Sequence, residues 1–174
     1  MLMRSLRQGL VAGTVGAVVM TIGEKVEQRL TGRPDSHVPG RVLARLTGAA
    51  EGRSRALNLP MHVGQAAMLG VVRSLMANAG VRGPVASAMF AVVRLSNDQV
   101  LENATGVGAP PQTWPRSELV VDVLHKTVYA FATGLVADAL AARTGPGPGQ
   151  RHAALRPGRH SDIGPLPRTA AAGR

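Results

Sequence analysis

Four long apolar segments, joined by connections that contain Pro and Gly, dominate this sequence. They cover residues 6–28, 59–80, 83–105 and 117–142. Each is rich in Ala, Val, Leu and Gly, and none alternates apolar and polar residues as a half-buried strand does. A helix of about 20 residues is about 30 Å long, which matches the hydrocarbon core of a bilayer. The sequence therefore predicts an all-α fold, a four-helix transmembrane bundle.

The first and third segments resemble each other. Aligned without gaps, residues 9–32 and 83–106 share nine identical positions, and both end in Thr-Gly. A Gly just beyond a helix favours the left-handed conformation that ends helices. Glu24 of the first segment falls opposite Asp98 of the third.

The second and fourth segments also align, although more loosely. "GVVRSLMA" from Gly70 parallels "GLVADALA" from Gly134, with His62 and His125 nearer the start of each segment. We therefore expect two tandem helical hairpins, each supplying one acid and one His. Because two-helix units repeat in the same orientation, their pseudo-twofold axis would lie along the membrane normal.

Small residues favour a membrane bundle over a soluble four-helix bundle, which is the alternative. Gly9 and Gly13 are four residues apart, a spacing that lets membrane helices pack by backbone contact. In water, each Gly inside a helix costs about 0.5–1 kcal/mol relative to Ala. Charged residues inside the segments argue for the soluble alternative: Arg73, Arg94, Asp98, Asp122 and Lys126. Spacings of four predict that two pairs of them, Arg94–Asp98 and Asp122–Lys126, form ion pairs within their helices.

The connections and the ends of the chain carry further signals. "MLMRSLRQ" at the start is followed by fifteen uncharged residues, as in a signal sequence, but no cleavage site follows. We therefore expect an uncleaved first span. Within the first long connection, Val38, Val42, Leu43 and Leu46 fall on one face of a short amphipathic helix, which would lie at the membrane interface or cover a soluble bundle.

Residues 143–174 are basic and rich in Pro and Gly, which predicts a disordered tail. Such a tail could contact anionic lipid or nucleic acid. We expect instead a solvated tail with no specific nucleic-acid partner.

The chain contains no Cys, which excludes disulfides, thiolate metal sites and a Cys nucleophile. It also lacks phosphate-binding, dinucleotide-binding and nucleophile-elbow motifs. We therefore expect no enzymatic activity and no cofactor.

Two stretches resemble the YagU-like family of small bacterial inner-membrane proteins. "GLVAGTVGAVVMTIGEKVEQRLTGRP" is similar to that family's first span, and "GVGAPPQTWPRSELVVDVLHKTVYAF" to its last loop and span. The resemblance covers most of residues 9–142 and implies a bacterial cytoplasmic (inner) membrane protein. It also implies a set of loop and helix residues, here Pro110, Pro111, Trp114, Pro115, Glu118 and His125. The family's function is unknown, so the resemblance implies no mechanism.

Polar residues form stripes at helical spacing on the predicted spans. Asp122, His125 and Tyr129 follow one another at i, i+3 and i+7, and such stripes in membrane helices face the bundle interior. We expect Glu24, His62, Asp98 and His125 to converge there.

Two acids and two imidazoles could relay protons, handle small ions or hold a divalent metal, although the common helical metal motifs are absent. Alternatively, these side chains only form hydrogen bonds between helices and fix their packing. In a further alternative, the protein is a membrane scaffold that binds partner helices or further copies of itself.

Overall fold

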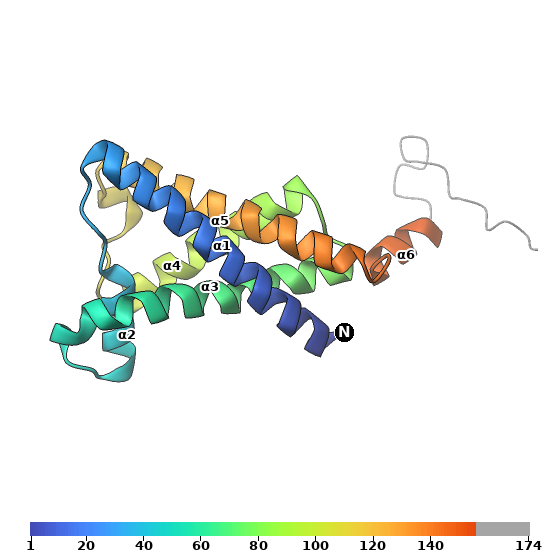
Figure 1. Cartoon of the computed structure of the whole chain (residues 1–174), viewed down its shortest axis with the longest axis horizontal. Helices are drawn as coiled ribbons and strands as arrows, with labels where there is room; N and C mark the ends of the chain where they lie inside the picture. Colours follow the sequence, from blue (N-terminus) through green and yellow to red (C-terminus); the bar gives the residue numbers. More distant parts are fainter. Residues whose placement is uncertain (156–174) are drawn as a thin grey trace, which may run out of the picture.

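The computed structural model describes residues 1–155. Within them every secondary-structure element is a helix, as predicted. The elements are α1 (Leu2–Thr31), α2 (Val38–Thr47), η1 (Glu51–Arg53), α3 (Ser54–Ala79), α4 (Pro84–Ala104), η2 (Pro111–Thr113), α5 (Arg116–Ala142) and α6 (Pro148–Leu155). Helices α1, α3, α4 and α5 correspond to the four predicted segments and follow the long axis of the molecule (Figure 1).

Helix α1 crosses α3 and also packs on α5, while α4 packs mainly on α5 and only slightly on α3. Helix α2 and the connection before α5 gather at one end of the bundle, and the N-terminus and α6 lie toward the other (Figure 1). We call these the α2 end and the α6 end.

Glycine and proline set most helix ends where the sequence predicts. Gly32 and Gly106 follow α1 and α4 with φ of 73° and 67°. This is the left-handed conformation expected for the Gly of each Thr-Gly pair. Pro84 opens α4. Helix α3 begins at Ser54, before the predicted start of its segment at residue 59, so that Pro60 lies inside the helix rather than in its first turn.

The predicted helix in the first long connection is present as α2, but its buried face differs from the prediction. Val42 and Ala44 are each 2% exposed, whereas Leu46 is 56% exposed. The reason is that α2 approaches α3 at Gly40, where an added Cβ would lie 1.9 Å from the Ser54 carbonyl oxygen. This contact turns Leu46 outward.

The long helices touch each other at small residues. A Cβ added at Gly70 of α3 would lie 2.3 Å from the Gly9 carbonyl oxygen and 2.6 Å from Gly13 Cα, so the backbones of α1 and α3 are in direct contact. On α5, a Cβ added at Gly134 would lie 2.1 Å from Ser87 Oγ, a side-chain atom of α4. The Gly9–Gly13 face is therefore covered by a helix of the same chain.

Charged side chains are buried inside the bundle beside two clusters of apolar residues, while many large aliphatic side chains lie on the outer surface. Four charged side chains on the long helices are at most 7% exposed: Arg73, Arg94, Asp98 and Lys126. By contrast, Val85, Val92 and Val100 on α4 and Leu135 on α5 are 62–74% exposed. The outward faces of α4 and α5 are therefore strongly apolar.

Within residues 1–155, two helices are long and apolar enough to cross a membrane, namely α1 and α5. The buried share of the apolar window is 33% in α1, which lies near the N-terminus, and 28% in α5. The other two predicted spans, α3 and α4, fall short of this criterion; they include Arg73, Arg94 and Asp98.

Part of the predicted tail is helical. Residues 148–155, which we expected to be disordered, form α6, with Pro148 as its first residue. Gly147 just before it lies against Asn78 and Ala79 at the end of α3. The rest of the predicted tail lies outside the described residues.

Candidate functional site

A polar cleft of about 660 Å³ opens at the α2 end. Its walls come from the C-terminal part of α1, from residues 33–37 and the start of α2, and from the adjoining parts of α3, α4 and α5, with Trp114 at the connection before α5. Five of the six residues singled out in the sequence line it: Glu24, His62, Asp98, Asp122 and His125. The sixth, Tyr129, is completely buried and does not line the cleft.

Asp98 on α4 is the centre of the charged network at the floor of the cleft. Its Oδ1 accepts a hydrogen bond of 2.9 Å from Gln65 Nε2 of α3. Its Oδ2 lies 3.3 Å from Arg94 Nε and 3.1 Å from Lys126 Nζ of α5. One carboxylate thus ties three helices together.

Lys126 connects this centre to a second carboxylate. Its ammonium donates a hydrogen bond of 2.8 Å to Asp122 Oδ2, one turn earlier on α5. Both predicted i,i+4 ion pairs are therefore present. Since two cations face two carboxylates, the network is neutral as a whole, which lowers the cost of burying it.

Tyr129 packs against Arg94, one member of this network. The Arg94 guanidinium carbon lies 5.1 Å from the centre of the Tyr129 ring, a cation–π distance. The Tyr129 hydroxyl donates a hydrogen bond of 2.6 Å to the Ala66 carbonyl oxygen, and its ring packs 5.8 Å from that of Phe90. Tyr129 thus contacts Arg94 directly, and Phe90 packs against Tyr129.

The two imidazoles contact different partners. His62 Nε2 shares a hydrogen bond of 3.3 Å with Thr21 Oγ1 of α1. His125 Nε2 lies 3.6 Å from Glu27 Oε2, also on α1.

Glu24, the acid that the sequence singled out on α1, instead lies 3.9 Å from Arg33. The structure therefore brings Glu24, His62, Asp98 and His125 to one cleft but not into direct contact with each other. The cause is that His125 is turned toward Glu27, one turn further along α1 than expected.

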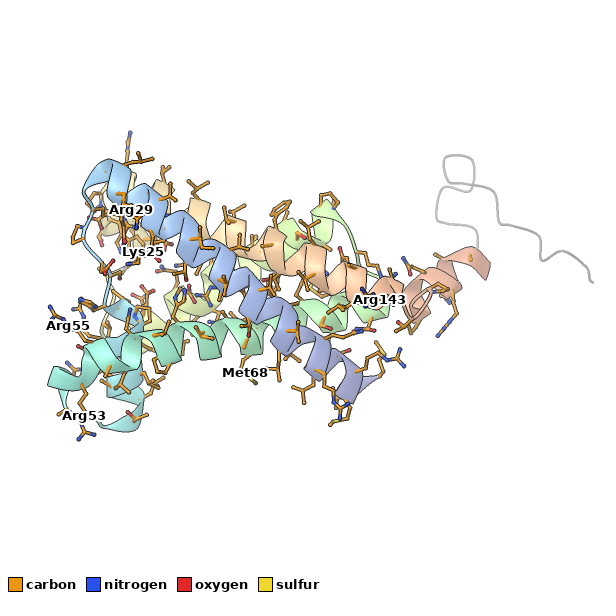
Figure 2. The ribbon with its side chains drawn as sticks, in the orientation of Figure 1. Lys25, Arg29, Arg53, Arg55, Met68 and Arg143 are labelled. Carbon is orange, nitrogen blue, oxygen red and sulfur yellow. The ribbon has the colours of Figure 1, made fainter. Side chains whose placement is uncertain are left out.

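An ion pair of Lys25 with Asp35 lies at the rim. The hydrogen bond from the Lys25 ammonium lowers the pKa of the Asp35 carboxyl below its ordinary value. Figure 2 shows Lys25 and Arg29 near the end of α1, and Arg53 of η1 and Arg55 of α3 on the other side of the α2 end.

The cleft itself has a different charge balance from the chain. The chain carries a formal net charge of +10, yet six carboxylates and only four Lys or Arg side chains line the cleft. The carboxylates are Glu24, Asp35, Asp98, Glu102, Glu118 and Asp122. Among residues 1–155, no three His, Asp or Glu side chains are grouped closely enough to hold a metal ion.

A second buried ion pair, which the sequence analysis did not single out, lies nearer the α6 end. Arg73 Nη2 of α3 is 2.9 Å from Asp138 Oδ2 of α5 and 3.3 Å from Ser87 Oγ of α4. The Gly83 N–H also donates to Asp138, at 2.8 Å. An Arg inside an apolar helix requires a buried acid, and Asp138 is the acid that follows Asp122 on α5; this signal could have identified the pair.

Comparison with protein families, with characterised proteins and with solved structures found no match to this chain. The resemblance to the YagU-like family therefore stays a prediction.

Proposed function

We propose that this chain is an integral membrane protein that crosses the bilayer with α1, α3, α4 and α5. The outward face of α4 is the observation that carries the proposal: Val92 is 62% exposed, while Arg94 and Asp98 on the inward face are 4% and 6% exposed. An aliphatic face of this kind is unfavourable in water, whereas in lipid it is solvated and the charges are paired inside.

Alkaline carbonate extraction of cell membranes tests this proposal. An integral protein stays in the membrane pellet after the wash, because its aliphatic faces remain in lipid. A chain released into the supernatant without detergent would overturn the proposal in favour of a soluble bundle. The resemblance to the YagU-like family would place the protein in a bacterial inner membrane.

The cleft, in this proposal, admits protons or small ions to the charged network at its floor, with no catalytic step. Its surplus of carboxylates favours cations at the mouth. Asp98 and Asp122 present carboxylates that Lys126 already bridges, so an arriving cation would compete with its ammonium group for them.

Uptake by proteoliposomes under an imposed potential tests this part. The charge-balanced variant Asp98→Asn/Lys126→Met removes the central pair and should reduce proton or cation uptake by about tenfold. Lys25→Met/Asp35→Asn removes an exposed pair in the same balanced way and should retain most of the uptake, since exposed charges are screened. Equal uptake by the wild type and Asp98→Asn/Lys126→Met would contradict ion handling.

An internal repeat is also part of the proposal. In the alignment of segments, Gly13 corresponds to Ser87 and Gly70 to Gly134. The contact between Gly13 and Gly70 in the first hairpin has a counterpart between Ser87 and Gly134 in the second. Equivalent residues thus make equivalent helix contacts, which supports two related hairpins.

A membrane scaffold is the second candidate. It is favoured by the aliphatic face of α4, whose limited packing on α3 leaves room for a partner helix. Disulfide crosslinking of Val92→Cys in native membranes distinguishes the two: a scaffold or homo-oligomer gives a crosslinked band, and a monomeric ion-handling protein does not.

A further inference from the structure

The cleft is much larger than a bare ion requires. Its volume of about 660 Å³ lies within the range of about 300–1,000 Å³ that is usual for sites of small organic ligands. A single water molecule, by comparison, occupies about 30 Å³ in the liquid. The size of the cleft therefore fits an organic solute.

Arg94 offers unused hydrogen-bond donors at the floor. It lines the cleft, is 4% exposed, and its buried Nε and Nη1 donate no hydrogen bond within the described chain. Its ion-pair partner Asp98 is shared with Lys126 and Gln65. A guanidinium has five N–H donors in a planar fork that matches a carboxylate or phosphate. The floor is therefore suited to an anionic group.

Glu102 offers an unpaired acceptor nearer the mouth. It lines the same cleft two turns beyond Arg94 on α4, about 12 Å along the helix axis at about 1.5 Å per residue. No Lys, Arg or His of residues 1–155 forms an ion pair with it, and the same holds for Glu118. These carboxylates are suited to an ammonium group.

We propose that the cleft binds a compact zwitterion, with its carboxylate or phosphate on Arg94 and its ammonium on Glu102. A lone anion would face six carboxylates, and a lone cation would leave the Arg94 donors without an acceptor. The inference rests on the proposed membrane-embedded cleft and extends it from ions to a class of organic ligand. Free amino acids and the phosphoethanolamine headgroup of a lipid share this chemistry.

Isothermal titration calorimetry of the full chain in detergent tests the proposal with three probes of matched length: 6-aminohexanoate, hexanoate and hexylammonium. We expect 6-aminohexanoate to bind at least about tenfold more tightly than either single-charge probe. Arg94→Gln should remove the advantage of the zwitterion over hexylammonium, and Glu102→Gln its advantage over hexanoate.

Two further variants keep the test decisive. Arg143→Gln removes an exposed cation at the α6 end and should bind 6-aminohexanoate as the wild type does (Figure 2). If Arg94→Gln does not fold, Arg94→Lys keeps the charge but loses the planar fork, and it should weaken binding by about tenfold. Equal binding of the three probes, or a Glu102→Gln variant with unchanged affinity for the zwitterion, would overturn the proposal.

Titration in nanodiscs distinguishes the two ligand sources. If phosphatidylethanolamine in a phosphatidylglycerol bilayer weakens 6-aminohexanoate binding, the natural ligand is the headgroup; if it has no effect, the ligand is a free solute. Both outcomes support a zwitterion site. Carbonate extraction does not depend on any ligand, so failure of the binding tests would leave the membrane assignment intact.

Discussion

Arg73 on α3 and Asp138 on α5 form an ion pair of 2.9 Å in which the arginine side chain is completely buried and the aspartate side chain is 21% exposed. The Asp138 carboxylate also receives the Gly83 N–H at the start of α4. Three helices therefore depend on one carboxylate, and the arginine has no other anionic partner within the described residues.

Asp138→Asn should destabilise the protein by about 3–5 kcal/mol, because it leaves a buried guanidinium without its counter-charge. Denaturant unfolding in detergent, followed by circular dichroism, measures this loss. The double variant Arg73→Met/Asp138→Asn should recover most of it, since no unpaired charge remains. A loss below about 1 kcal/mol for Asp138→Asn would mean that the pair does not hold the helices together.

Gly70→Ala should destabilise the fold, because its Cβ would lie 2.3 Å from the Gly9 carbonyl oxygen. Overpacking at such a contact costs about 1–3 kcal/mol. Gly64→Ala on the same helix is the matched control: it has no neighbour within 4 Å and should be neutral or stabilising by up to about 1 kcal/mol. Equal thermal stability of the two variants would contradict direct backbone contact between α1 and α3.

Tyr129→Phe should cost about 0.5–1.5 kcal/mol, the usual contribution of one hydrogen bond, because it removes the bond to the Ala66 carbonyl and keeps the ring under Arg94. Tyr129→Leu loses the ring as well and should cost more. Unfolding of both variants measures the difference between them, which reports the aromatic contacts. If both variants lost the same stability, the cation–π contact would contribute nothing.

Asp98→Asn should be more damaging than Lys126→Met. Removing the Asp98 charge leaves Arg94 and Lys126 with only Asp122 between them, whereas removing Lys126 leaves Asp98 with Arg94 and leaves Asp122 at 26% exposure to water. Thermal denaturation of the two single variants in one detergent compares them. A lower melting temperature for Lys126→Met would contradict Asp98 as the centre of the network.

The positions of the helices along the chain follow from local signals that a single sequence contains. Apolar segments bounded by Pro84 and by Gly32 or Gly106 locate the ends of α1 and α4, since those residues act on the backbone nearby. The same holds for ion pairs four residues apart, such as Arg94–Asp98, because one helix determines their geometry.

Contacts between helices were harder to predict, because helix rotation and crossing are not local properties. His125 meets Glu27 rather than Glu24, and because these two acids lie on successive turns of α1, the sequence alone does not determine which of them faces α5. The Arg73–Asp138 pair joins residues 65 positions apart, and only the packing of α3 on α5 brings them together. The helical α6 likewise depends on its position beside the end of α3.

The account depends on α3 and α4 lying in lipid together with α1 and α5, and the absence of Cys from the chain allows a direct test. Single Cys variants at Met68, Val92 and Leu135 lie on the outward faces of α3, α4 and α5, and Arg29→Cys and Arg143→Cys lie at the two ends (Figure 2). The measurement is the rate of labelling by a charged maleimide in membranes opened to both sides. We predict that the three outward positions remain unlabelled until detergent is added, while the two end positions react at once. Rapid labelling of Val92→Cys in intact bilayers would contradict a membrane-spanning α4.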